Sequence, residues 1–208
     1  MYTLDKQSAM QADKTSNWLS ETGKYVGKIL CAEDIKAATG TRGVALTLQS
    51  NDGRETRQFV YTVKADGEKL SGYDLLMALM TCLKLRDIKP AAGQVKRWDR
   101  ESKQEYTEQA TVFPELAGKP IGFLLQKTEE ESRKNPGQTA WTAKLVGVFE
   151  AGTELMAAEI LTGKTKPEQL AARVALLADR PLKNRKAAPA QQEYGGGNSD
   201  FADESIPF

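Results

Sequence analysis

Apolar and polar residues alternate along the first third of the chain in a pattern that predicts three consecutive β-strands. The first apolar run covers residues 25–32, and residues 43–49 follow with alternate apolar side chains. A turn at residues 51–53, Asn-Asp-Gly, leads into a third run at residues 57–63. A period of two is typical of a strand with one buried face, and Asp-Gly between two such runs indicates a hairpin.

The period changes beyond residue 70, where the pattern predicts a helix. Apolar side chains recur at helical spacing over residues 73–83, and Ser71 with Asp74 resembles a capping box at the start. Lys84 is placed for the last turn, and Pro90 lies beyond the expected end.

The second half of the chain shows weaker patterns. Residues 91–110 are polar and charged, and no element is predicted there. The remaining apolar runs predict two strands, at 120–127 and 139–149, which are joined by a polar loop over 129–138. Two short helices are predicted after them, at about 153–161 and about 166–179.

Three strands, a helix and two further strands are the element order of an OB-fold, a small five-stranded barrel that commonly binds oligonucleotides. We therefore predict a mainly β protein with helices. We expect an N-terminal arm at residues 1–20 and an OB-fold DNA-binding domain at residues 21–150. A helical appendage is expected at residues 151–186, and a disordered linker with an acidic tip at residues 187–208.

The last residues combine acidic and apolar side chains behind a segment rich in Ala, Gln and Gly. That segment has no apolar periodicity, which is typical of a flexible linker. The residues expected to bind a partner are Asp200, Phe201, Asp203, Glu204, Ile206, Pro207 and Phe208. Their carboxylates and rigid apolar end suit a partner pocket with an apolar slot beside an Arg or Lys.

An acidic stretch that ends in Ile206-Pro207-Phe208 resembles the C-terminal tip of bacterial single-stranded DNA-binding proteins. In that family the tip recruits replication and repair enzymes. The resemblance covers the tip only, and it implies a phage-encoded or otherwise divergent single-stranded DNA-binding protein. Proteins of this kind are often multimeric, so a homo-oligomer is compatible with the sequence.

The distribution of charge agrees with this interpretation, although the net charge of the whole chain is only +1. Residues 1–186 contain all 29 basic residues and 24 of the 28 acidic ones, so this part carries a net charge of +5. A basic body with an acidic tail suits a nucleic-acid binder that has a separate protein-binding tip. No apolar run reaches the length of a membrane span, and the chain opens without an apolar signal region, so we expect a cytoplasmic protein.

Single-stranded DNA is bound by cations that contact phosphates and by aromatic side chains that stack on bases. The first candidate region is a segment interpreted as a loop, in which Trp98 stands between cations and either stacks on a base or folds back onto the barrel. The third strand is the second region, with Phe59 expected in the core and Tyr61 equally suited to core or surface. The predicted DNA-binding residues of these two regions are Lys96, Arg97, Trp98, Arg100, Arg57 and Tyr61.

The third candidate region joins the last strand to the loops that grip ligands in OB-folds. Trp141 and Lys144 lie on the strand, Arg133 and Lys134 in the loop before it, and Arg42 in the loop that joins the first two strands.

Enzymatic function has little support in the sequence. The chain has no histidine, and its two cysteines, Cys31 and Cys82, stand in separate apolar runs typical of buried free thiols. Residues 158–165 nearly match a phosphate-binding loop, but Ala158 replaces the first glycine and the segment favours a helix that stops at Gly163. We expect no catalytic residues, no metal and no cofactor.

The sequence thus predicts a protein that binds and protects single-stranded DNA, without strong sequence preference, during replication, recombination or repair. One alternative is an interaction protein that binds no DNA and whose tip acts as a decoy for the same partner enzymes. A strand-annealing accessory and a nuclease are further alternatives.

Overall fold

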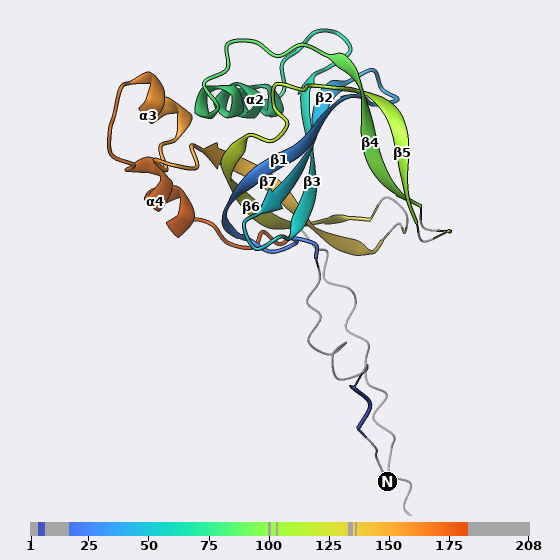
Figure 1. The fold of residues 1–208 in the computed structure, drawn as a ribbon. Coiled ribbons are helices and arrows are strands. Elements are labelled where there is room, and N and C mark those ends of the chain that lie inside the picture. The colour runs from blue at the N-terminus through green and yellow to red at the C-terminus, as the bar shows by residue number, and fades with distance from the viewer. Residues whose placement is uncertain are drawn as a thin grey trace, which may run out of the picture.

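The computed structural model describes residues 4–6, 17–99, 101–102, 104–132, 135 and 137–182. The predicted linker and acidic tip lie outside the described residues, as does most of the predicted arm. In the described part, the strands form one antiparallel sheet of seven strands, and the helices are few and short (Figure 1). The elements are β1 (Gly23–Lys36), β2 (Arg42–Ser50), β3 (Glu55–Val63), α2 (Ser71–Cys82), β4 (Ala91–Asp99), β5 (Gln104–Val112), β6 (Pro120–Glu131), β7 (Thr139–Phe149), α3 (Ala157–Leu161) and α4 (Gln169–Ala175).

The sheet is organised around β1, which pairs with strands on both of its edges. One edge pairs with β2, which in turn pairs with β3, and the other edge pairs with β6 and then touches β5 at Glu33. β6 pairs with β7 over most of their length. The predicted order of three strands, a helix and two strands is therefore confirmed, with the β4–β5 hairpin inserted between α2 and the last two strands.

The main core fills the space between the inward faces of the strands and α2. Ile29, Leu46 and Phe123 come from β1, β2 and β6, and Leu79 comes from α2; all four are almost fully buried. Full burial of one such side chain stabilises the fold by about 1.5–3 kcal/mol. Leu19, which lies in the predicted arm, is buried in this core, and its N–H donates to the carbonyl of Glu55 on β3.

The helix α2 forms as predicted, but its ends differ from the expected ones. Leu70 is the N-cap and makes no side-chain capping hydrogen bond, so the expected capping box is wrong. Lys84 lies beyond the last turn and adopts a positive φ of 56°. The start of the helix packs directly on β3, since a Cβ added to Gly72 would lie 2.2 Å from the carbonyl oxygen of Tyr61.

The β4–β5 hairpin was not predicted. It lies at the opposite side of the sheet from α3 and α4 (Figure 1). Most of its side chains are exposed on both faces, so its sequence has no apolar alternation; Val95 is the one residue of β4 that is fully buried. Arg97 ties the hairpin to β1 through Glu33, and this long-range contact has no local sequence signal.

The helical appendage packs on the outer face of β6 and β7. Phe149 and Leu124 of the sheet and Leu170 of α4 form a second buried cluster there. Glu159 is buried between the two helices, and its carboxylate accepts backbone N–H groups of Met156, Glu168 and Gln169 at 2.7–2.9 Å. These bonds stabilise the charged form and lower the pKa of Glu159. No helix in the described part of the chain has the length and apolar character of a membrane span.

Candidate nucleic-acid interface

The strand β3 presents aromatic side chains to the outside and polar side chains to the inside. Phe59 is 55% exposed and Tyr61 is 40% exposed, so the expectation that Phe59 lies in the core is wrong. The buried face carries Thr56, Gln58 and Thr62 beside Val60. This inversion is stable because the buried polar groups are satisfied by hydrogen bonds.

Gln58 has the central role on the buried face. Its side-chain N–H donates to the Thr56 hydroxyl at 2.7 Å, and its side-chain oxygen accepts the backbone N–H of Leu145 on β7 at 2.9 Å. No ladder joins β3 to β7 among the described residues, and barrel closure by backbone pairing is not detected. A side chain therefore bridges the gap between these two edge strands.

A groove of about 880 Å³ follows this gap between β3 and β7. Arg57, Phe59 and Tyr61 line it from β3, and Lys144 lines it from β7. The first turn of α2 closes one end, where Ser71 and Gly72 lie. The groove thus brings together three of the predicted DNA-binding residues, Arg57, Tyr61 and Lys144, and adds Phe59.

Both cations of the groove have carboxylate partners. Arg57 donates to Glu33 at 2.9 Å and lies over the Phe59 ring, 5.2 Å from its centroid. Lys144 forms an ion pair with Glu130. The Nε of Arg57 is buried and has no hydrogen-bond partner among the described residues. The ion pairs hold both side chains in place, and they also offset part of the positive charge.

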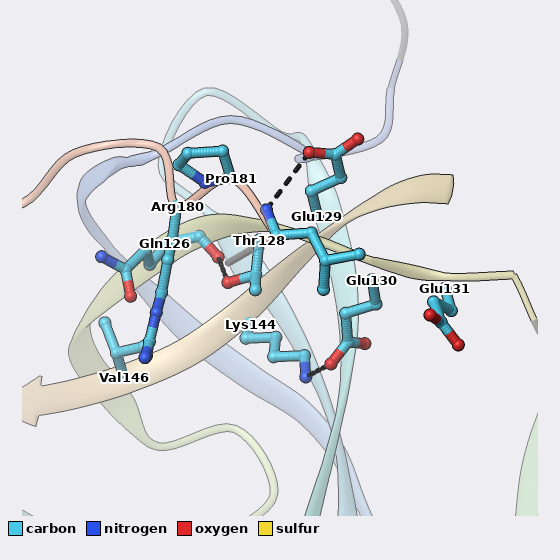
Figure 2. A pocket seen from close by; sticks show the side chains of 10 residues that line it. Gln126, Thr128, Glu129, Glu130, Glu131, Lys144, Val146, Arg180 and Pro181 are labelled. Atoms are coloured by element: carbon cyan, nitrogen blue, oxygen red, sulfur yellow. Dashed lines mark hydrogen bonds and ion pairs between the residues drawn. The ribbon is translucent and has the colours of Figure 1, made fainter. Parts of the chain in front are cut away.

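A second hollow, of about 590 Å³, adjoins the groove and shares Lys144 and Glu130 with it. Figure 2 shows Lys144 and Glu130 pointing toward each other, with Arg180 extending along the wall toward Val146. Arg180 is held by its backbone, because its N–H donates to the carbonyl of Lys127 at 2.8 Å. Arg180 was not predicted from the sequence, since only this tertiary pairing places it beside the groove.

A third hollow, of about 510 Å³, is lined by two tryptophans, Trp18 and Trp98. Trp98 is 61% exposed and Trp18 is 51% exposed, so Trp98 does not fold back into the core. Trp98 lies on β4 rather than in a loop. Trp18 was not among the predicted site residues, although an aromatic residue in a polar segment was a signal for it.

The cations before Trp98 have different environments. Arg97 points to Glu33, with contacts of 2.8 and 3.3 Å, and also donates to Glu108 at 2.9 Å. Its bonds to Glu108 and Glu33 raise the pKa of Arg97. Arg97 therefore anchors the hairpin rather than extending into a groove, whereas Lys96 is exposed and lies 3.4 Å from Glu105.

The remaining predicted residues do not join the groove or lie outside the described part. Trp141 is 45% exposed, and the Lys127 ammonium lies 5.6 Å from its ring centroid. Arg42 is exposed at the start of β2, 3.6 Å from Asp34. The predicted site residues that lie outside the described part are Arg100, Arg133, Lys134, Asp200, Phe201, Asp203, Glu204, Ile206, Pro207 and Phe208.

The segment that resembles a phosphate-binding loop is helical, as predicted. Residues 158–161 of this segment belong to α3, and Gly163 follows the helix with a positive φ of 70°. The described residues contain no group of three or more side chains of the His, Cys, Asp and Glu types that could hold a metal ion. Cys82 is buried and free, and burial raises the pKa of its thiol to about 11, whereas Cys31 is free but only half-buried.

No protein-family model matches the chain, and no curated protein matches it in sequence.

Proposed function

We propose that this protein binds single-stranded DNA without strong sequence preference, along the outward face of β3. The observation that carries the proposal is the pair of exposed aromatic side chains, Phe59 and Tyr61, in a groove that also holds Arg57 and Lys144. Stacking of bases on aromatic rings contributes about 1–3 kcal/mol per base and tolerates any sequence. Arg57 and Lys144 are placed to contact the phosphates between the stacked bases.

We also propose that β1, β2, β3, β6 and β7 form an OB-fold barrel that is open between β3 and β7. The pairings of β1 with β2 and β6, and of β2 with β3, support this assignment. OB-folds bind oligonucleotides on the face of their second and third strands, which is the face that carries Phe59 and Tyr61. The β4–β5 hairpin is then an insertion that flanks the binding face.

The measurement that tests the proposal is fluorescence anisotropy of a labelled oligo-dT at low and moderate salt. A duplex of the same length is the matched control. We expect tight, salt-dependent binding to the single strand and much weaker binding to the duplex, because stacked and paired bases cannot reach the aromatic rings. Absence of binding at low salt would refute the proposal.

The acidic tip supplies a second, separable activity in this proposal, the recruitment of replication, recombination or repair enzymes. Its support is the resemblance of Ile206-Pro207-Phe208 and the preceding acidic residues to tips of bacterial single-stranded DNA-binding proteins. Deletion of residues 199–208 should abolish binding to a purified enzyme that recognises such tips, and should leave DNA affinity equal or higher. A scrambled tip of the same composition is the control, and a large loss of DNA affinity would contradict this division.

The second candidate function is an interaction protein that binds no DNA and acts through its tip alone. The observation that favours it is the pairing of Arg57, Lys144, Arg97 and Lys96 with carboxylates, which leaves less positive charge for phosphates. The anisotropy measurement separates the two functions, because only the first requires binding by the described part of the chain.

A further inference from the structure

The hollow between Trp18 and Trp98 continues the outward face of β3. Glu55, which lines this hollow, belongs to the same alternating row as Arg57, Phe59 and Tyr61. At about 3.4 Å per residue, the row from residue 55 to residue 61 spans about 20 Å. A strand that lies along the groove therefore reaches the two tryptophans at the end of the row that is farther from α2.

The chemistry of this hollow differs from that of the groove. Two indole rings and the carboxylates of Glu55 and Glu105 line it, together with Asn17 and Gly53. Carboxylates accept hydrogen bonds but do not donate them, and they repel phosphate. The hollow thus suits a flat aromatic ring whose edge carries hydrogen-bond donors.

Both carboxylates keep acceptor capacity for a ligand. Glu55 accepts one hydrogen bond from the Gln49 side chain at 3.1 Å, through Oε1. Glu105 contacts the Lys96 ammonium through Oε2 at 3.4 Å. A carboxylate offers about four acceptor sites, so these contacts with described residues leave further acceptor sites on each carboxylate.

We propose that this hollow is a base-binding subsite that prefers bases with an exocyclic amine, which are cytosine, adenine and guanine, over thymine. The indoles of Trp18 and Trp98 stack on the ring, and Glu55 or Glu105 accepts the amine N–H. Cytosine N4, adenine N6 and guanine N2 are donors, whereas thymine has no exocyclic amine and presents a carbonyl oxygen in place of the cytosine N4, which a carboxylate repels. This inference rests on the proposed function and adds a modest base preference to it.

The test compares the affinities of oligo-dC and oligo-dT of equal length by anisotropy at slightly alkaline pH, where cytosine is neutral. For the unmodified protein we expect oligo-dC to bind about threefold to tenfold more tightly, the effect of one additional hydrogen-bonded base edge at a half-exposed site. Glu105→Gln and Glu55→Gln should each lower this ratio toward one. Glu101→Gln, which removes an exposed carboxylate outside the hollow, should leave the ratio unchanged.

Trp98→Ala tests the stacking part of the inference. It should lower the affinity for both oligonucleotides by about tenfold, the usual effect of removing one stacking platform. Trp98→Phe should retain much of the affinity, which separates loss of stacking from loss of folding. If Trp98→Ala binds both oligonucleotides with unchanged affinity, the inference is overturned. This result is expected if the hollow binds a cationic side chain of a partner protein instead of a base.

The outcomes also separate this inference from the proposed function. Tight and equal binding of oligo-dC and oligo-dT would overturn the base preference and leave single-stranded DNA binding intact. Failure of the unmodified protein to bind either strand would overturn both.

Discussion

At the scale of single residues, β3 exchanges the expected positions of Gln58 and Phe59. The Gln58 side chain is buried, and both the N–H and the oxygen of its amide are hydrogen-bonded. These bonds largely offset the usual free-energy cost of burying a polar group. Phe59 is exposed, and the Arg57 guanidinium lies over its ring. An exposed aromatic side chain adds little to the core, and we interpret its place in the groove beside Tyr61 as support for the proposed binding of DNA.

Substitution of Phe59 tests that role directly. Phe59→Ala should weaken oligo-dT binding by about 1–3 kcal/mol, because one stacking platform is lost. The free energy of unfolding should change by less than about 0.5 kcal/mol, as for most exposed positions. Leu176→Ala, which removes another exposed apolar side chain on the appendage, is the control for both measurements. If the two variants bind DNA equally well, Phe59 does not contact the strand.

Gln58 provides the opposite case, a residue that matters for stability. Gln58→Leu leaves the half-buried N–H of Leu145 without its acceptor and should lower the free energy of unfolding by about 1–2 kcal/mol. Urea denaturation measures this change, and Gln94→Leu on the exposed face of β4 is the control. Equal stability of the two variants would show that the Gln58 bridge between β3 and β7 contributes nothing.

At the scale of elements, the accuracy of the sequence-based prediction follows the strength of local patterns. β2, β7 and α2 have one apolar face each, and their predicted ranges agree closely with the observed ones. The β4–β5 hairpin was missed because its residues are mostly exposed and its attachment depends on Glu33, more than 50 residues earlier in the sequence. Phe59 was misassigned because the pattern of β3 contains no information on the partners of Gln58.

Glu33 links two elements that flank the candidate interface. Its buried carboxylate binds Arg57 of β3 and Arg97 of β4, and Glu33→Gln would leave two guanidinium groups without their shared anion. Since both arginines are partly exposed, we expect a loss of about 1–3 kcal/mol in stability, less than for a fully buried pair. Thermal unfolding measures this loss of stability.

Glu108→Gln is the matched control for this prediction. Glu108 also contacts Arg97, but its side chain is 51% exposed, so its removal should cost less than about 1 kcal/mol. Equal stability of the two variants would show that burial of Glu33 does not strengthen the link between β3 and the hairpin.

At the scale of the whole molecule, the sequence predicted the types of residue that line the candidate interface but not their arrangement. The groove gathers Arg57, Tyr61 and Lys144, whereas Trp98 lies in a different hollow and Arg97 serves as an anchor. These differences depend on ion pairs between residues distant in sequence, which no local pattern encodes. The net charge of +5 on residues 1–186 therefore overstates the charge that the candidate interface offers to phosphates.

The salt dependence of DNA binding tests this view of the electrostatics. Each phosphate neutralised on a single strand contributes about −0.7 to the slope of log K against log salt, so five contacts would give about −3.5. Arg57, Lys144 and the adjoining Arg180 would neutralise two or three phosphates, and we therefore expect a slope of about −1.4 to −2. Anisotropy titrations of oligo-dT over a series of salt concentrations measure it.

Removal of one cation identifies the source of that slope. Lys144→Ala should make the slope shallower by about 0.7, the contribution of one phosphate contact. Lys166→Ala, which removes an exposed cation that lines none of the three hollows, should leave it unchanged. A slope near zero would exclude phosphate contacts, whereas a slope of −3.5 that is insensitive to Lys144→Ala would locate the binding surface outside the groove. A slope near −2 that becomes shallower in Lys144→Ala and not in Lys166→Ala would place the phosphate contacts in the groove.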